Sequence, residues 1–375
     1  MSHFVELARK SYTSIAVYSP YKVRNKLRWW NELFPTIKPY YAIKSFDHPY
    51  ILHTTATSGL IGGFDVASRG EIEKVAKYGL PMIHSNPVKL DEDIISANDH
   101  DVTLHVCDDV PSIKQVRRIQ PKAQIVWRIK SLESFSRIRF NEKFGSGVGV
   151  TTQTILDAKE YGGIYGLSFH VGSACSNMRV FVDMLNRIEH ELFPVWKYTS
   201  MPLPKLIDIG GGFRTVDGIH SISKEMTELT RDWKKKYGIE FIAEPGRYIS
   251  EESLTLYTRV IAVKRRETAN NETPHYNIYI NDSIYQSFSG IMYDKMKPIP
   301  EPTYSPQSIR SFAYCTIWGN TCDGCDKIVD SILLPIPRVN DVFRWRNMGA
   351  YTLVSGSVNF NGFQPARVVS VDEVE

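Results

Sequence analysis

The sequence predicts an α/β fold with a closed (β/α)8 TIM barrel and a second, all-β C-terminal domain, and two patterns along the chain indicate this. Between Pro39 and Gly246, short apolar segments alternate with longer segments of helical period, as expected for repeated strand–helix units around a parallel sheet. After about Leu254 the chain changes to β-branched and aromatic runs without a clear helical period. We therefore expect the barrel domain at residues 19–253 and the β domain at residues 1–18 and 254–375.

The barrel prediction depends on a count of eight strands. Helical segments lie between the strands, for example 71–78, 152–161 and 223–237, and a glycine follows each of these three, as is common where a helix ends. The apolar segments with the length of strands are 40–44, 63–67, 82–85, 102–107, 124–129, 165–171, 206–210 and 240–243. Eight strand–helix units are the number that closes a barrel of this type.

A further strand is predicted at 14–18, ahead of the barrel. Ser19 and Pro20 then provide an N-cap and a first-turn proline for a helix with Val23, Leu27 and Trp30 on one face. We expect the 14–18 strand to join the C-terminal sheet. The strands of that sheet are predicted at 256–263, 276–281, 328–334 and 368–371.

The composition is that of a globular protein without a nucleic-acid or membrane partner. The 375 residues are 42% hydrophobic, which is enough for one large domain or two ordinary ones. The net charge of +4 is spread along the chain, and the basic runs at 234–236 and 264–266 are short enough to be solvated faces. No apolar run approaches the length of a membrane span and the first residues lack a signal pattern, so we expect a cytoplasmic location.

The five cysteines predict reduced thiols, because their number is odd and the chain is long. Cys322 and Cys325 have the spacing of half a zinc site or of a redox pair. No second Cys-x-x-Cys and no pair of histidines accompanies them. The sequence therefore predicts no metal site.

Polar and small residues gather at the predicted C-terminal ends of the strands, which is where barrel active sites are built. They are Lys44, Asp65, Asn86, Arg128, His170, Gly210–Gly212 and Glu244. Residues with purely structural roles would fall at either end of the strands about equally often. The one-sided placement therefore predicts an active site at this end of the barrel.

Three members of this set suggest a pyridoxal phosphate pocket. Lys44 follows an apolar strand and could form an imine with an aldehyde. The glycines at 210–212 let backbone N–H groups approach a phosphate. Glu244 could pair with a protonated pyridine nitrogen.

Motifs along nearly the whole chain resemble those of one enzyme family. In order they are Tyr41–Lys44, Phe64–Ser68, Asn86–Pro87, Lys143–Gly145, Ser168–Ser173, Asp208–Phe213, Ala243–Tyr248, Tyr293–Asp294, Trp318–Gly319, Thr321–Gly324 and Met348–Tyr351. Together they resemble the fold-type III pyridoxal-phosphate-dependent decarboxylases of basic amino acids, most closely the ornithine decarboxylase group.

The resemblance implies roles for residues of the cofactor site. Lys44 would bond covalently to the cofactor, Glu244 would pair with its ring nitrogen and His170 would stack on the ring. Asp65 and Arg139 would form a polar pair near Lys44. The remaining cofactor-binding residues, most of them at the phosphate, would be Ser173, Gly210, Gly211, Gly212, Gly246, Arg247 and Tyr351.

The resemblance also implies a homodimer whose active sites are shared between subunits. Asp294 with Tyr293, and Asp323 from the neighbouring subunit, would hold the distal ammonium of a basic amino acid. Cys322 would protonate the substrate carbon after carbon dioxide has left. The residues that would line the substrate entrance are Tyr285 and Phe360.

The reaction implied by the resemblance is decarboxylation of L-ornithine to putrescine in polyamine biosynthesis. Asp294 favours ornithine, since a relative active on arginine carries a glutamate at this position. Departures from the family pattern, such as Ser45–Phe46 and Cys325, weaken the choice of ornithine more than that of decarboxylation. Arginine and lysine stay open as substrates, as does a non-catalytic role like that of the antizyme inhibitors. A racemase of the same fold is disfavoured because racemases lack the segment at 321–324.

Overall fold

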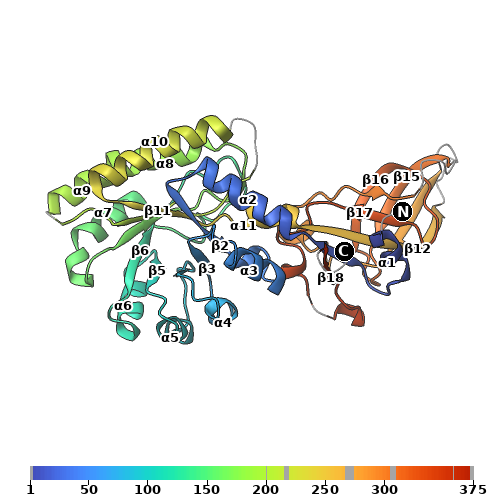
Figure 1. Ribbon diagram of the computed structural model, residues 1–375, viewed down its shortest axis with the longest axis horizontal. Helices are drawn as coiled ribbons and strands as arrows, with labels where there is room; N and C mark the ends of the chain where they lie inside the picture. The colour runs from blue at the N-terminus through green and yellow to red at the C-terminus, as the bar shows by residue number, and fades with distance from the viewer. Residues whose placement is uncertain are drawn as a thin grey trace. The chain divides into compact units, whose positions relative to one another are not determined.

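The computed structural model describes residues 3–199, 201–214, 219–266, 274–304, 310–357 and 359–371. The chain divides into two compact units, whose elements are coloured by residue number in Figure 1. Arg24–Ile249 forms one unit, and Met1–Val23 together with Ser250–Glu375 forms the other. Helix α2 (Pro20–Leu33) spans the first limit between them.

The first unit is built on a closed sheet of eight parallel strands. Around the barrel they are β2 (Ile37–Ala42), β3 (Gly63–Val66), β4 (Met82–His84), β5 (Leu104–Cys107), β6 (Gln124–Arg128), β8 (Gly166–Ser168), β10 (Leu206–Asp208) and β11 (Glu240–Ala243). β11 pairs with β2 and closes the sheet. The (β/α)8 barrel predicted from the eight apolar segments is therefore confirmed.

Helices follow the strands along the chain and surround the barrel (Figure 1). Gly79, Gly162 and Gly238, which are predicted to end helices, have φ angles of +63°, +78° and +71°, a left-handed conformation that suits glycine. In the described ranges no helix is both long enough and apolar enough to cross a bilayer. The helices include α3 (Pro49–Ala56), α4 (Arg69–Ala76), α5 (Asp91–Asp99), α6 (Val110–Ile119), α7 (Val148–Leu156), the 3-10 helix η2 (Ala158–Tyr161), α8 (Arg179–Arg187), the π-helix η3 (Ile188–Leu192), α9 (Phe193–Thr199), α10 (Ile219–Tyr237) and α11 (Gly246–Ser250).

The interior of the barrel is filled by one cluster of apolar side chains. Its buried members are Tyr40, Ile83, Val106, Val126, Leu206 and Ile242, from six different strands. Because side chains alternate along a strand, the residues next to these members point outward, toward the helices. A short antiparallel ribbon of β7 (Ser136–Ile138) and β9 (Ser173–Cys175) follows β6 and β8 in the chain.

The second unit is organised around a mixed sheet, which has eight strands in the described part of the chain. They are β1 (Ile15–Tyr18), β12 (Leu254–Arg266), β13 (His275–Ile280), β14 (Glu301–Pro302), β15 (Phe312–Trp318), β16 (Lys327–Pro335), β17 (Val342–Trp345) and β18 (Arg367–Ser370). β1 pairs antiparallel with β12 and parallel with β18. The prediction that the N-terminal strand joins the C-terminal sheet is therefore confirmed.

Helix α1 (His3–Lys10) is absent from the elements predicted by the sequence. Its buried residues Val5 and Ala8 pack with Ile15, Val17 and Tyr257 of the sheet. Two turns of helix are too short for a helical period to be recognised, and an isolated helix of this length is unstable in water. Packing against β1 and β12 therefore stabilises α1.

Two histidines lie side by side on the outer face of β4 and β5. The ring centroids of His84 and His105 are 5.4 Å apart and both side chains are buried. Burial, and next the positive charge of Lys89, lowers the pKa of His84 to about 2 and the pKa of His105 to about 4. His105 Nε2 donates to Gln120 Oε1 at 2.7 Å, at the end of α6. Both imidazoles are therefore neutral at neutral pH.

We expect acid to destabilise the barrel through these histidines. In the unfolded chain their pKa returns to roughly 6.5. Between that pH and about 4 the unfolded chain binds more protons than the folded one, so the free energy of unfolding falls as the pH falls. His84→Phe removes one titrating group. The free energy of unfolding of this variant should therefore fall less steeply with falling pH than that of the wild type, and the two slopes should differ by up to roughly 1.4 kcal/mol per pH unit.

Thermal unfolding between pH 7 and pH 4.5 measures this difference. The control is His220→Phe, a substitution at an exposed position of α10. If the wild type and His84→Phe lose stability with the same slope, the histidine pair is not the cause of acid sensitivity.

Candidate functional site

Lys44 lies at the C-terminal end of the first barrel strand. It belongs to a single 3-10 turn, η1 (Ile43–Ser45), which follows β2 directly. Its Nζ donates to Oδ2 of Asp65 on β3 at 2.6 Å. The Asp65 side chain is fully buried, whereas that of Lys44 is 37% exposed. The buried carboxylate, which also accepts a hydrogen bond from Ser85 Oγ, therefore fixes the lysine amine at the rim of the barrel.

Two carboxyl groups lie together at the ends of β10 and β11. Burial raises the pKa of Asp208 to about 7. Burial, and next the neighbouring Asp208, raises the pKa of Glu244 well above its usual range. The two side chains are hydrogen-bonded to each other, and Asp208 Oδ1 also accepts the Gly210 N–H at 2.9 Å. The pair therefore holds at least one proton at neutral pH.

His170 follows β8 and is held in one tautomer. Its Nδ1 accepts the backbone N–H of Gly172 at 3.0 Å, which leaves the proton of the neutral ring on Nε2. Phe140 packs edge-on against the imidazole, with ring centroids 4.9 Å apart. Burial, and next the charges of Arg128 and Lys44, lowers the pKa of His170 well below its usual range. A neutral ring at this position can stack on an aromatic ligand.

The glycine segment Gly210–Gly212 follows β10 and packs against the loop after β8. A Cβ at Gly211 would lie 2.8 Å from His170 Nε2, and one at Gly212 would overlap the backbone oxygen of Gly172. Gly212 also has a φ of +104°, which other residues rarely adopt. The backbone of this loop is therefore bare of side chains, as a phosphate-binding loop requires.

Arg247 of α11 is buried and its Nη2 donates to Ser173 Oγ at 3.1 Å. Ser173 begins β9, and the Cys175 N–H of the same strand donates to Gly212 O at 3.0 Å. Arg247 is preceded by Gly246, where a Cβ would lie 3.0 Å from Ser45 Cβ. A cation, a hydroxyl group and the glycine loop therefore form one neighbourhood suited to an anion.

Arg128, the last residue of β6, adds a second cation to the rim. Burial lowers the pKa of Arg128, while the negative charges of Glu244, Asp108 and Asp208 act against this. Its charge also acts on His170. Arg139, which the resemblance places near Lys44, follows β7 and is exposed. The sequence had placed Arg128 at a strand end without giving it a role.

Glu71 of α4 belongs to the same electrostatic group, although the sequence analysis did not select it. Burial, and next the Asp65 carboxylate, raises the pKa of Glu71 to about 7, while the charge of Lys44 acts in the opposite direction. Its Oε2 accepts the Ala67 N–H at 2.6 Å. Ser68 accepts the Glu71 N–H, so the available signal was a helix-capping pattern, Ser-x-x-Glu.

The second unit contains the residues that are expected to bind substrate. Tyr285 Oη donates to the Asp323 carboxylate, and the Phe360 ring stacks on Tyr285 with centroids 3.9 Å apart. The hydrogen bond to Asp323 raises the pKa of Tyr285 to about 12, while the Cys325 N–H and then Tyr285 lower the pKa of Asp323. Asp323 is therefore an ionised carboxylate, and Cys322 next to it is exposed.

Tyr293, Asp294 and Tyr351 are also in this unit. Tyr293 ends the short helix α12 (Gly290–Tyr293) and is 71% exposed. Asp294 follows it and is buried, with its backbone N–H donating to Gly290 O at 2.9 Å. A Cβ at Gly290 would lie 2.8 Å from the Tyr351 carbonyl oxygen. The three residues therefore belong to one neighbourhood.

The residues at the barrel rim fit pyridoxal phosphate. The amine can bond to the aldehyde, and the protonated carboxyl pair can face the pyridine nitrogen. The neutral imidazole can stack on the ring. The glycine loop and the buried arginine can bind the phosphate. In the described parts of the chain no three or more His, Cys, Asp or Glu side chains are arranged to hold a metal ion.

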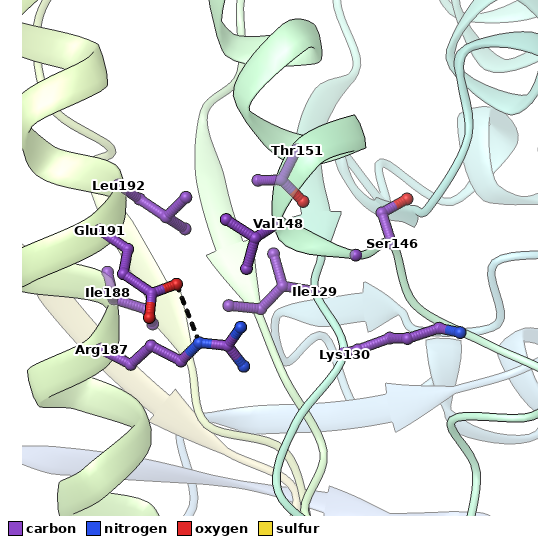
Figure 2. A pocket seen from close by; sticks show the side chains of 10 residues that line it. Ile129, Lys130, Ser146, Val148, Thr151, Arg187, Ile188, Glu191 and Leu192 are labelled. Carbon is purple, nitrogen blue, oxygen red and sulfur yellow. Dashed lines mark hydrogen bonds and ion pairs between the residues drawn. The ribbon is translucent and has the colours of Figure 1, made fainter.

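A small cavity of the barrel unit lies elsewhere, between the segment after β6, the start of α7 and the π-helix η3 (Figure 2). Its apolar wall includes Ile129, Val148 and Leu192. Arg187 Nε donates to Glu191 Oε2 at 3.0 Å at its edge, as Figure 2 shows. None of the residues predicted to form the active site lines this cavity.

Residues 21–251 match the family model of the pyridoxal-binding domain of pyridoxal-dependent decarboxylases. The chain is 33% identical over 366 residues to ornithine decarboxylase of Rattus norvegicus. The aligned region covers 93% of this chain and 78% of that protein. It is 32% identical over 363 residues to antizyme inhibitor 2 of Xenopus laevis, covering 92% of this chain and 78% of that protein.

Among solved structures, the chain resembles the arginine decarboxylase of Paramecium bursaria Chlorella virus bound to agmatine. The TM-score is 0.88 at 26% sequence identity, and the match covers 98% of each chain.

We expect Gly212→Ala to weaken pyridoxal phosphate binding about tenfold or more, which is roughly 1.4 kcal/mol. The added methyl group would displace the loop after β8, because it overlaps Gly172 O and lies 2.8 Å from Val171 Cγ2. Gly79→Ala is the matched control, since Gly79 also has a positive φ but no atom lies within 4 Å of the added Cβ. Titration of the cofactor-free proteins by absorbance measures the affinity. Equal losses in both variants would mean that backbone strain, and not the contact between the two loops, causes the effect.

Proposed function

Because the chain belongs to the pyridoxal-dependent decarboxylase family, we propose that it converts L-ornithine to putrescine and carbon dioxide. The class of enzyme, a pyridoxal-phosphate-dependent amino acid decarboxylase, follows from the family. We also propose that the enzyme is located in the cytoplasm and catalyses a step of polyamine biosynthesis.

Asp294 is the observation that carries the choice of ornithine. Its side chain is buried, and its backbone is fixed at the end of α12. A carboxylate away from water attracts an ammonium group more strongly than an exposed one does. Asp323 supplies a second carboxylate, which is ionised and oriented by Tyr285. Two short acids suit the compact distal ammonium of ornithine.

The barrel rim binds the cofactor and presents the amine that holds it. Bound pyridoxal phosphate supplies an electron sink, because its ring accepts the electron pair that remains when carbon dioxide leaves. Lys44 Nζ would be the point of covalent attachment. It becomes nucleophilic when it loses a proton, and the Asp65 carboxylate lies 2.6 Å away to orient it. Arg247, Ser173 and the glycine loop would hold the phosphate.

The Asp208–Glu244 pair would supply the proton for the ring nitrogen of the bound cofactor. At neutral pH the pair holds a proton, so Glu244 would be the residue that pairs with that nitrogen and keeps it protonated. Arg128, whose charge acts on both acids, limits the build-up of negative charge at the rim. His170, neutral and fixed by Gly172, would stack on the ring.

We propose a homodimer in which Cys322 and Asp323 of one subunit complete the site at the other subunit's barrel. Both residues lie on an exposed loop of the second unit, beside Tyr285 and Phe360. Once carbon dioxide has left, the substrate carbon needs a proton. The Cys322 thiol donates it and regains it from solvent after the product leaves.

The alternatives keep most of this chemistry. An arginine or lysine decarboxylase would use the same rim residues with a different fit around Asp294. A non-catalytic binding protein has no need of Lys44, the Asp208–Glu244 pair or the Arg247–Ser173 contact, all of which are intact and tied into the rim. This favours an enzyme over a regulator-binding relative.

We expect kcat/KM for ornithine to exceed that for arginine and for lysine at least about tenfold, or roughly 1.4 kcal/mol in transition-state binding. Asp294→Glu should narrow this ratio, since the acid reaches one methylene further. Asp330→Glu, at an exposed position of β16, is the control. Trapping of carbon dioxide and identification of the amine measure each rate. A tenfold preference for arginine would contradict the assignment of ornithine as the substrate. Release of no carbon dioxide from any of the three amino acids would contradict the assignment as a decarboxylase.

We expect a mixture of inactive Lys44→Ala and Cys322→Ala proteins to recover about a quarter of wild-type activity after subunit exchange. About half of the dimers would then be mixed, and each mixed dimer would have one complete site. Lys44→Ala mixed with Glu244→Ala is the matched control, because both residues belong to the same barrel and no complete site can form. With exchange confirmed by mass spectrometry, recovery no greater than the sum of the two single variants rules out shared sites.

A further inference from the structure

The side chain of Asn361 contacts Cys322 at two points. The Cys322 backbone N–H donates to Asn361 Oδ1 at 3.2 Å, and the Cys322 thiol donates to the same oxygen at 3.4 Å. Both donors need an acceptor, so the amide oxygen and not the amide nitrogen faces Cys322. We propose that Asn361 is a positioning residue, which directs the Cys322 thiol for proton delivery. This inference rests on the proposed function, in which Cys322 is the proton donor.

The turn that carries Asn361 has an unusual backbone. Asn361 has φ 52° and ψ 17°, in the left-handed region, and Asn359 and Gly362 are left-handed as well. Asparagine tolerates this conformation better than most residues, but it still requires support from the surrounding structure. Backbone of this kind is concentrated at functional sites, where it aims a side chain.

The loop that carries Cys322 is fixed from the opposite side. Buried Asp326 accepts the Thr321 N–H at 3.1 Å, the Thr321 hydroxyl at 2.6 Å and the Ile284 N–H at 3.0 Å. Phe360, next to Asn361, stacks on Tyr285. The 321–326 and 359–362 segments are therefore both attached to the 284–285 segment. The Asn361–Cys322 contact joins two loops of fixed position.

An amide oxygen suits this role chemically. It is a weak base, so it accepts the thiol hydrogen bond without removing the proton. A carboxylate would hold the same proton more strongly, because hydrogen bonds to a charged acceptor are stronger. Cys325, three residues further on, is also exposed but is hydrogen-bonded to Asp323 instead. The two thiols of this loop therefore have different partners.

A misdirected thiol has a chemical signature. A proton placed on the substrate carbon gives the amine product. A proton placed on the cofactor carbon leaves the substrate nitrogen on the cofactor, and water then releases the carbon skeleton as an aldehyde. The ratio of aldehyde to amine therefore reports where the proton goes, independently of how fast carbon dioxide is lost.

Asn361→Gly tests the role in the holoenzyme, because glycine keeps the left-handed backbone and removes the amide. Asn359→Gly is the matched control, since Asn359 is also left-handed but its side chain contacts Gln364. We expect Asn361→Gly to raise the aldehyde-to-amine ratio about fivefold, the effect of losing one typical hydrogen bond. It should lower kcat with little change in KM, whereas Asn359→Gly should behave as the wild type.

A second measurement does not depend on catalysis. In the cofactor-free protein, the rate of alkylation of each thiol by iodoacetamide is followed by peptide mass spectrometry. We expect Asn361→Gly to speed alkylation of Cys322 about fivefold and Asn361→Asp to slow it. Cys325 in the same molecule serves as the internal reference and should react at an unchanged rate.

The outcomes separate this inference from the function on which it rests. If Cys322→Ala raises the aldehyde fraction but Asn361→Gly does not, Cys322 is the donor and the positioning role of Asn361 is wrong. A raised aldehyde fraction in Asn361→Gly with unchanged alkylation of Cys322 also overturns it, because the effect would not act through the thiol. If Cys322→Ala leaves the aldehyde fraction unchanged, the donor assignment itself fails.

Discussion

The closure of eight parallel strands into one barrel is the constraint on which the candidate site depends. Since all strands run in the same direction, their C-terminal ends form a single rim. β11 pairs with β2, so the segment after the last strand lies beside the segment after the first. A Cβ at Gly246 would lie 3.0 Å from Ser45 Cβ for this reason, although 200 residues separate the two in the chain. Lys44 and Glu244 meet at the rim through the same pairing.

The protonation state of each charged side chain at the rim depends on its neighbours as well as on its own type. Asp65 faces Lys44 directly and forms an ion pair. Asp208 and Glu244 face each other, so burial and like charge favour protonation of the pair. Burial, and next the charges of Arg128 and Lys44, lowers the pKa of His170 and keeps its ring neutral. The same type of side chain therefore has different protonation states within one rim, as acid–base chemistry at neutral pH requires.

The second unit presents its functional groups on loops, and these loops are held together by side chains. Asp326 binds the segments at 284 and 321, and Phe360 stacks on Tyr285. Asp323 and Cys322 are each oriented by a neutral neighbour, Tyr285 and Asn361 respectively. On a mobile loop, the carboxylate and the thiol would point in many directions. Fixed neighbours orient the two groups and so reduce their conformational entropy before substrate binds.

The sequence by itself determined the barrel, the strand that the N-terminus adds to the second sheet and the rim position of Lys44, Asp65, His170 and Glu244. These follow from local patterns, since apolar periodicity defines the strands, glycine ends the helices, and parallel strands place their ends together. Helix α1 was not predicted, because packing against the sheet stabilises it more than the helix propensity of its short sequence does.

Tertiary structure alone decided which side chains touch and which protons they hold. The shared proton of Asp208 and Glu244, the charge of Arg128 beside them and the raised pKa of Glu71 arise from burial, which a sequence does not state. The contact between Asn361 and Cys322 joins residues 39 apart through a left-handed turn. No periodic pattern encodes such a turn, because its conformation is stabilised by the loops packed around it.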